Sequence, residues 1–205
     1  MDFGTMADTT SPALARFRII LWTLVVIAAL GATALFIFRP PTAPLGVTGK
    51  PFALESTDGS TFTEASLKGT PSLVFFGYTH CPDVCPTTLA ESDAWKSELG
   101  LSPEQLRTIF VTVDPARDTK EVLADYLGSF PGVIGLVGTE QQTADAKASF
   151  GAMSEATAPD ADGFYLVNHT ASVFLINKDG QFEGTIAYGE PKDTAVAKIK
   201  KLMAS

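Results

Sequence analysis

The sequence predicts an α/β domain preceded by an N-terminal transmembrane helix, and three observations indicate this architecture. First, residues 17–38 form an apolar run in which Arg18, at its start, is the one charged side chain. Second, from residue 52 onward, short runs rich in β-branched and aromatic residues alternate with segments of helical periodicity. Third, the only two cysteines, Cys81 and Cys85, follow directly after one of the predicted buried strands. A chain of 205 residues is long enough for one globular domain and a short appendage.

Residues 17–38 are long enough to cross a membrane. A helix of this length spans about 33 Å, and the hydrocarbon core of a bilayer is about 30 Å thick. Arg16 and Arg18 slightly outweigh Arg39 across the span, so we expect residues 1–16 to form a cytoplasmic tail. A cleaved signal peptide is the alternative, but cleavage would leave apolar residues exposed. The tail does not resemble a transit peptide. We therefore expect a single-pass protein of a bacterial inner membrane, with its C-terminal domain in the periplasm.

A linker and an acidic domain follow the anchor. Residues 39–47 hold three prolines and no periodic pattern, which predicts a stiff, extended linker before the domain of residues 48–205. The first 38 residues contain two of the 15 basic and two of the 23 acidic side chains, so 13 basic and 21 acidic ones remain. An acidic domain is a poor nucleic-acid binder, because phosphate contacts need Lys and Arg. Two cysteines are too few for a disulfide-stabilised scaffold.

The predicted elements of the domain begin with a small hairpin and continue as a β-α-β unit and then an antiparallel β-β-α unit. This succession is the thioredoxin arrangement, in which reactive cysteines lie where the first long strand meets its helix. Asp118 is expected to cap the helix that follows it. The segment 151–163 is expected to be irregular. The expected strands are 52–54, 61–63, 72–77, 107–113, 133–137, 171–176 and 181–187, and the expected helices open at 87, 118, 139 and 191.

The cysteines lie in the segment Gly77 to Pro86, with the sequence GYTHCPDVCP. Because proline is favoured at the first helical position, a helix is expected to begin at Pro86 with Cys85 near its cap. The positive end of the helix dipole there favours the thiolate, the form that binds metals and attacks disulfides. Two thiolates so placed can form a disulfide, hold a soft metal ion, or alternate between the two.

A third metal ligand would have to be one of the two histidines. His80 adjoins Cys81 in an extended segment, where neighbouring side chains point in opposite directions, so we expect a partly exposed residue there. His169 precedes a predicted strand that the thioredoxin topology places beside the cysteine loop. A lone histidine is more often a surface or core residue, so the residues alone leave His169 open. Zinc prefers four ligands, whereas copper(I) accepts two or three.

Three ordered blocks resemble the signatures of the Sco/SenC family. They are the segment 77–86 with its two cysteines, the segment 111–119 (VTVDPARDT), and His169-Thr170 before a strand. The resemblance covers about residue 49 to the C-terminus, together with the single N-terminal anchor. It implies a thioredoxin-fold, membrane-anchored copper protein that helps to assemble the copper A centre of cytochrome c oxidase.

The resemblance also implies the residues of the site. Cys81, Cys85 and His169 are the implied ligands of copper(I) or copper(II), and Asp114 matches an acidic position near the metal. For Asp114 a plain carboxylate at the end of a strand is the alternative. Asn168 stands where the family often has Asp, and it lacks the charge that could tune the histidine. The implied partners are cytochrome c oxidase subunit II, a copper donor chaperone and a thioredoxin-like reductant.

The leading function is thus a copper metallochaperone, in which reduced Cys81 and Cys85 bind copper and their disulfide cannot. The alternative is a thiol-disulfide oxidoreductase acting on partner cysteines with the same redox-active pair, or a redox sensor. The three-residue spacing and the spare His169 fit disulfide exchange less well. A thiol peroxidase is a further alternative, although no arginine adjoins the cysteines in sequence. An inert disulfide is disfavoured, because a strand-helix junction is a poor place for a structural crosslink.

Overall fold

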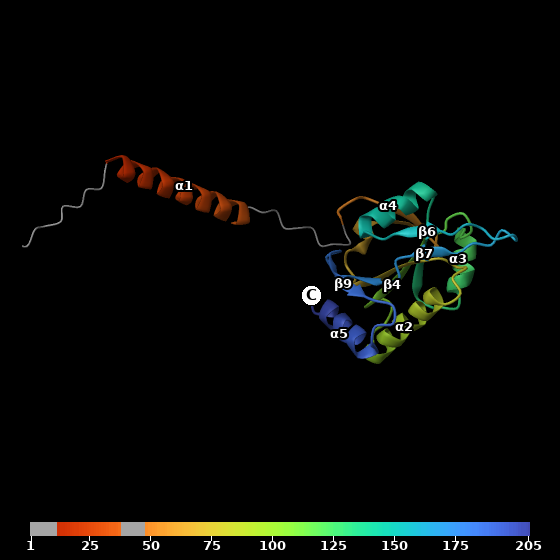
Figure 1. The fold of residues 1–205 in the computed structure, drawn as a ribbon. Helices are drawn as coiled ribbons and strands as arrows, with labels where there is room; N and C mark the ends of the chain where they lie inside the picture. Colours follow the sequence, from red (N-terminus) through yellow and green to blue (C-terminus); the bar gives the residue numbers. More distant parts are fainter. Residues whose placement is uncertain (1–11, 38–47) are drawn as a thin grey trace, which may run out of the picture. The chain divides into compact units, whose positions relative to one another are not determined.

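The computed structural model describes residues 12–37 and 48–205, and the chain divides into two compact units. The expected linker of residues 39–47 and the greater part of the expected tail lie outside the described residues. The first unit contains helix α1 (Pro12–Ile37) (Figure 1). Its segment Arg16–Thr33 is long and apolar enough to cross a membrane, judged by length and composition.

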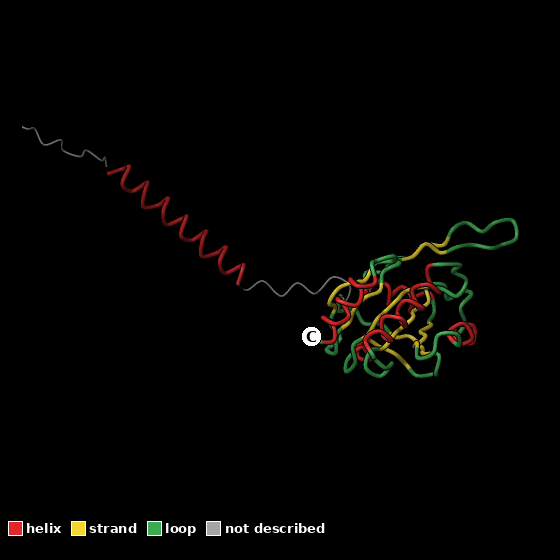
Figure 2. Tube along the Cα trace, turned by 90° about the horizontal axis from the view of Figure 1, so that it is seen from below, coloured by secondary structure: helices red, strands yellow, loops and turns green. Residues whose placement is uncertain are grey.

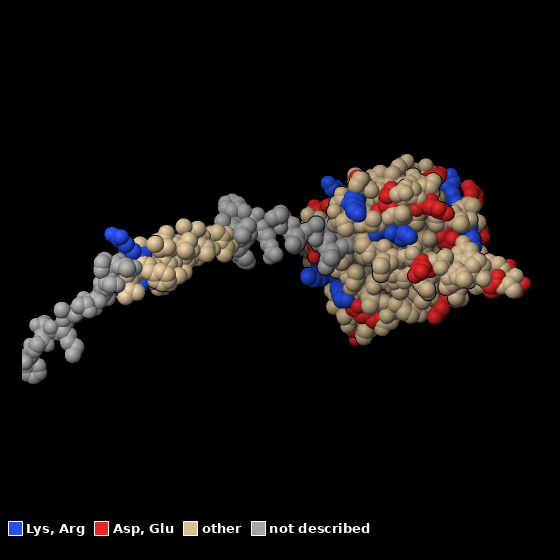
Figure 3. Space-filling view, turned by 45° about the horizontal axis from the view of Figure 1, so that its top comes forward, with Lys and Arg blue, Asp and Glu red and all other residues tan. Residues whose placement is uncertain are grey.

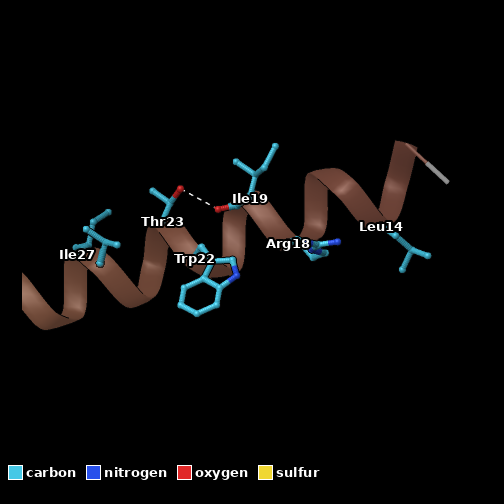
Figure 4. A pocket seen from close by; sticks show the side chains of 7 residues that line it. Leu14, Arg18, Ile19, Trp22, Thr23 and Ile27 are labelled. Atoms are coloured by element: carbon cyan, nitrogen blue, oxygen red, sulfur yellow. Dashed lines mark hydrogen bonds between the residues drawn. The ribbon is translucent and has the colours of Figure 1, made fainter. Parts of the chain in front are cut away.

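Helix α1 carries few polar groups, and the hydroxyl of Thr23 is satisfied within the helix (Figure 4). The hydroxyl of Thr23 donates a hydrogen bond to the carbonyl of Ile19 at 2.8 Å. Such a bond suits a lipid environment, which offers no partner of its own. A shallow hollow along α1, lined by Trp22 and Ile27 among others, is formed by this helix alone. It is the open side of a helix and holds no thiol, imidazole or carboxylate.

The second unit is built on a seven-stranded sheet with the strand order β2-β1-β5-β4-β3-β8-β9. Strand β3 lies parallel to β4, and β4 lies parallel to β5, whereas β8 runs antiparallel to β3. β3 is buried along its whole length and joins the parallel half to the antiparallel half. The strands of the sheet are β1 (Ala53–Ser56), β2 (Thr61–Thr63), β3 (Ser72–Gly77), β4 (Arg107–Thr112), β5 (Val133–Val137), β8 (Val173–Ile176) and β9 (Phe182–Ile186).

Helices cover both faces of this sheet (Figure 1). Phe75 and Phe76 are neighbours in β3 and therefore point to opposite faces. Phe75 packs against Phe110, which in turn contacts Tyr126 of α3, whereas Phe76 packs against Phe150 of α4. Helices α2, α3 and α5 lie on the Phe75 face, and α4 lies on the other. The helices are α2 (Val84–Leu99), α3 (Lys120–Leu127), α4 (Glu140–Phe150) and α5 (Lys192–Met203), with a short 3-10 turn at Glu64–Leu67.

One segment differs from the sequence expectation. The stretch 151–163 is not wholly irregular, because β6 (Ser154–Ala156) pairs antiparallel with β7 (Val167–His169) in a separate two-stranded sheet. Figure 2 shows this β6–β7 hairpin extending away from the rest of the domain. The strand β6 is short and carries no alternation of apolar and polar residues, so its sequence holds no strand signal.

Two helix starts also differ from expectation. Helix α2 begins at Val84, so Pro86 occupies the third helical position, where its missing amide costs nothing. Helix α3 begins at Lys120, and Thr119 caps it, because the Thr119 hydroxyl accepts a hydrogen bond from the amide of Val122 at 3.3 Å. The expectation that Asp118 caps this helix is therefore wrong, and its carboxylate makes other bonds.

Candidate metal centre

The loop between β3 and α2 holds both cysteines as free, buried thiols. The amide of Cys81 donates to the carbonyl of Tyr78 at 3.3 Å, which closes a tight turn after the strand. The amide of Cys85 donates to Sγ of Cys81 at 3.4 Å. Cys85 lies in the first turn of α2 and is fully buried, and Cys81 is 9% exposed. The loop thus aims both sulfurs into one place, with Cys81 nearer to the solvent.

His169 ends β7 and reaches the same place from a distant part of the sequence. Its Nε2 lies 3.5 Å from Sγ of Cys85. Its ring stands edge-on to the rings of Phe75 and Tyr78, with centroid separations of 5.8 Å for each. Nδ1 lies 3.1 Å from the carbonyl oxygen of Thr170, which can only accept, so Nδ1 carries the proton. The lone pair of Nε2 therefore faces the thiols, as a metal ligand requires.

The ligand atoms of Cys81, Cys85 and His169 all lie within 4.8 Å of one another. Within the ranges 12–37 and 48–205, this is the one such group of three or more Cys, His, Asp or Glu side chains. Two sulfurs and an imidazole nitrogen form a soft donor set, which suits copper(I). Structural zinc would lack a fourth protein ligand here. The chemistry of the donors therefore fits a copper ion.

Burial controls the protonation of these groups. Desolvation raises the pKa of the Cys85 thiol far above its ordinary value and lowers the pKa of His169 below its own. The expectation that the helix N-terminus makes a thiolate is therefore wrong for Cys85, because burial outweighs the helix dipole. His169 is held neutral, which leaves Nε2 able to bind a metal ion. A cation between the three groups would favour loss of the Cys85 proton.

Asp114 lies outside the group of three ligand atoms. It is buried at the end of β4, forms an ion pair with Arg117, and accepts a hydrogen bond from the Tyr165 hydroxyl at 2.8 Å. The guanidinium of Arg117 lies 5.7 Å from the centre of the Tyr78 ring, which contacts His169. Two residues thus separate the Asp114 carboxylate from the imidazole.

His80 and Asn168 also lie outside the group. The side chain of His80 is 45% exposed, and its Nδ1 lies 3.0 Å from the Thr79 hydroxyl. This matches the expected exposed position beside the cysteine loop. Asn168 is exposed and stands opposite Glu155 in the β6–β7 hairpin. Its side chain therefore lies at the surface, on the opposite face of β7 from the imidazole.

Sequence reasoning missed the role of Asp118, which is 1% exposed. Its carboxylate accepts hydrogen bonds from the amide and the hydroxyl of Thr79, at 3.0 and 2.6 Å, and from the hydroxyl of Thr112 at 2.6 Å. These bonds tie the start of the cysteine loop to the end of β4. The segment 111–119, which carries part of the family resemblance, holds Asp118, but its sequence alone does not tell a buried carboxylate from a helix cap.

Charges are mixed on the face of the molecule that Figure 3 shows. Lys and Arg side chains are interspersed with Asp and Glu. The connection between β6 and β7 contains Asp160 and Asp162. This face offers no continuous basic surface for a phosphate backbone. The distribution agrees with the acidic composition of the domain.

The fold and the site define a thioredoxin-like α/β protein with two thiols and an imidazole grouped where the central strand ends. The SCO1/SenC family model matches residues 41–204, and the chain belongs to this family. Both the expected fold class and the family resemblance are confirmed. The mitochondrial protein SCO2 of Saccharomyces cerevisiae is 37% identical over 159 residues, which cover 75% of this chain and 52% of the yeast protein. The chain thus spans about half the length of the first curated relatives that it matches.

Structures of several related proteins contain copper, and two of them show how far the likeness extends. That of Bradyrhizobium japonicum ScoI is 38% identical with a TM-score of 0.67, and the match covers 74% of this chain and 97% of that one. That of yeast Sco1 is 34% identical with a TM-score of 0.68, and the match covers 78% and 89% of the two chains. Because both matches cover 74% or more of this chain, the similarity extends over the whole domain and is not limited to the cysteine loop.

Proposed function

We propose that this chain is a membrane-anchored copper metallochaperone that assists assembly of the copper A centre of cytochrome c oxidase. Copper is its cargo, held by Cys81, Cys85 and His169. One observation carries the proposal: two sulfurs and one imidazole nitrogen lie within 4.8 Å of one another. The copper in the ScoI and Sco1 structures supports the choice of metal, because these proteins share the fold.

The protein's own groups determine how copper would enter. Nε2 of His169 already faces the thiols, because the Thr170 carbonyl accepts the proton on Nδ1. Cys85 is fully buried and gives up its proton as the cation arrives, so binding releases protons to the solvent. Cys81 is the more exposed thiol and is placed to meet the ion first. Three ligands rather than a closed set of four leave a position at which an acceptor's ligand could attach.

A second candidate function uses the same thiols. Both cysteines are free and their sulfurs lie within 4.8 Å, which favours a thiol-disulfide oxidoreductase. In that reaction the disulfide of a partner protein is reduced to two thiols while the Cys81–Cys85 disulfide forms. A redox sensor would rely on the same exchange. Oxidation of the pair would also remove two copper ligands, so the two roles can be linked in one cycle.

The proposal includes the cellular placement. Residues 17–38 anchor the chain in a bacterial inner membrane, residues 39–47 space the domain from it, and residues 48–205 act in the periplasm. Subunit II of the oxidase receives copper, a donor chaperone supplies it, and a thioredoxin-like reductant keeps the thiols reduced. Expression of the full chain in a bacterium tests the placement. We expect the protein to resist alkaline carbonate extraction and its domain to be digested by protease in spheroplasts. Carbonate-soluble protein or a protected domain would contradict it.

A copper(I) titration of the reduced full chain in detergent, against a chromogenic chelator, tests the proposed function. We expect stoichiometric binding that Cys81→Ser, Cys85→Ser and His169→Ala each weaken. His80→Ala is the matched control, since this histidine is a neighbour in sequence and lies outside the group. Equal affinity in wild type and in His169→Ala would reject the three-ligand site. No stoichiometric binding by wild type would leave disulfide exchange as the function to measure.

A further inference from the structure

The β6–β7 hairpin carries His169, but the strands of the seven-stranded sheet do not fix it. In the described part of the chain, β6 and β7 pair with each other alone. After His169, the chain is fixed again at Val173, where β8 begins and pairs with β3. Before His169, the described chain of the hairpin is not paired with any strand of the large sheet, although the rings of Phe75 and Tyr78 pack against the imidazole itself. The place of the imidazole therefore depends on how the preceding residues of the hairpin are attached.

Arg117 supplies that attachment by holding Tyr165, which lies four residues before His169. Its Nη1 donates a hydrogen bond to the carbonyl of Tyr165 at 2.9 Å, and its guanidinium lies 3.5 Å from the centre of the Tyr165 ring. Its Nε pairs with Asp114, whose second oxygen accepts from the Tyr165 hydroxyl at 2.8 Å. Two residues that follow β4 thus hold Tyr165 at its backbone, its ring and its hydroxyl.

The Tyr78 ring lies between the same guanidinium and the imidazole of His169. Arg117 stands 5.7 Å from the centre of the Tyr78 ring, and that ring meets His169 edge-on at 5.8 Å. Tyr78 is 2% exposed and begins the loop that leads to the cysteines. Arg117 therefore contacts both the chain that carries His169 and the chain that carries the thiols.

We infer that Arg117 is a positioning residue that holds His169 against the two thiols, with Asp114 orienting its guanidinium. The inference rests on the proposed copper site. It assigns Asp114 an indirect part, through Arg117 and Tyr165, in place of direct contact with the ion. Loss of partners that orient a metal ligand typically lowers metal affinity about 10- to 100-fold.

A further side-chain hydrogen bond attaches the hairpin to the domain. Lys147 of α4 donates to the hydroxyl of Ser154 at 2.7 Å. This bond holds β6, the strand opposite His169, through a single ammonium group. Arg117 instead holds the chain that leads into the strand bearing the ligand. It does so by a hydrogen bond to the Tyr165 carbonyl and by stacking on the Tyr165 ring. Its ion pair with Asp114 orients the guanidinium, and its side chain is 19% exposed. We therefore expect Arg117 to dominate the placement of the imidazole.

The test compares Arg117→Met, Arg117→Lys and Tyr165→Phe with a matched control, Arg107→Met. Arg107 is a second half-buried arginine that donates to backbone carbonyls, namely those of Ser66, Leu67 and Thr70, and it lies at the opposite end of β4. The reduced full chain in detergent is labelled with ring-13C histidine. Because the chain has two histidines, His80→Ala assigns the His169 signal. Copper(I) affinity and thermal unfolding are measured on the same samples.

We expect Arg117→Met to shift and broaden the His169 ring signal and to lower copper(I) affinity about 10- to 100-fold. Tyr165→Phe should cause a smaller change of both, and Arg117→Lys should recover part of the loss because it keeps the charge beside Asp114. Arg107→Met should lower the unfolding temperature and leave both site readouts at wild-type values. Equal losses in Arg107→Met and Arg117→Met would overturn the inference, and so would wild-type readouts in Arg117→Met. If wild type binds no copper, the proposed function fails, and the ring signal recorded without copper still decides the positioning role.

Discussion

Sγ of Cys85 lies 3.5 Å from Nε2 of His169, although 84 residues separate the two in the chain. The contact joins the first turn of α2 to the end of β7, and both groups are buried enough that each disfavours its charged form. A neutral imidazole whose lone pair faces a buried thiol has little to gain from a second proton. The arrangement is instead complementary to a soft cation.

Gly77 lets the buried thiol approach the end of β3. A Cβ at this position would lie 2.8 Å from Sγ of Cys85 and 2.8 Å from the Phe110 ring. We expect Gly77→Ala to displace the sulfur and to cost about 1–3 kcal/mol of unfolding free energy through overpacking. Copper(I) affinity should fall with it. Denaturant unfolding and copper titration measure the two effects.

Gly138→Ala is the control for this prediction, because a Cβ there would collide with Leu54 and Gln142, away from the thiols. It should lower stability and leave copper affinity unchanged. Wild-type copper affinity in folded Gly77→Ala would show that the sulfur position does not depend on this glycine.

Asp118 should contribute strongly to stability because it connects the cysteine loop to β4. Asp118→Ala leaves the Thr79 amide and the Thr112 hydroxyl without their acceptor, and each such buried group costs about 1–3 kcal/mol. Asp118→Asn should cost less, since its amide oxygen can accept both bonds. Urea unfolding compares these variants with Asp125→Ala, which removes an exposed carboxylate. A wild-type unfolding midpoint for Asp118→Ala would contradict this account of the loop.

Oxidation should convert the two thiols into one intramolecular disulfide and abolish copper binding. The sulfurs lie within 4.8 Å, so a small movement of the loop brings them to bonding distance. Diamide takes up the two hydrogens that the thiols lose, and intact mass and free-thiol assays record the change. Dithiothreitol should restore copper binding. Cys81→Ser cannot form the bond and serves as the control. Undiminished copper binding by the oxidised protein would refute the link between redox state and loading.

The central sheet and the cysteine loop could be predicted because their signals are local. Ser72–Gly77 and Val133–Val137 are apolar runs bounded by turn residues, and the structure has strands with the same ends. The cysteines follow the first of these strands, so the chain itself places them at the end of the central strand β3. His169 could be placed only through the topology and the family resemblance, since nothing in its own neighbourhood marks a ligand.

The supports of the site could not be predicted, because they depend on contacts between distant segments. Arg117 and Tyr165 are 48 residues apart, and their hydrogen bond exists only once the chain before β7 has met the segment that follows β4. Asp118 fits the sequence pattern of a helix cap. In the structure its carboxylate is buried and accepts hydrogen bonds from Thr79 instead. Local propensity predicts the hydrogen-bond partner of such a carboxylate poorly, because the carboxylate can accept either from a nearby helix amide or from groups that tertiary folding brings to it.

The central claim is that two sulfurs and one imidazole nitrogen hold a single copper ion. X-ray absorption at the copper edge of the copper(I)-loaded full chain measures this most directly. The account predicts two sulfur scatterers and one imidazole nitrogen in wild type, loss of the imidazole signal in His169→Ala, and an unchanged spectrum in His80→Ala. A spectrum with sulfur ligands alone in wild type, or an imidazole signal that persists in His169→Ala, would contradict it.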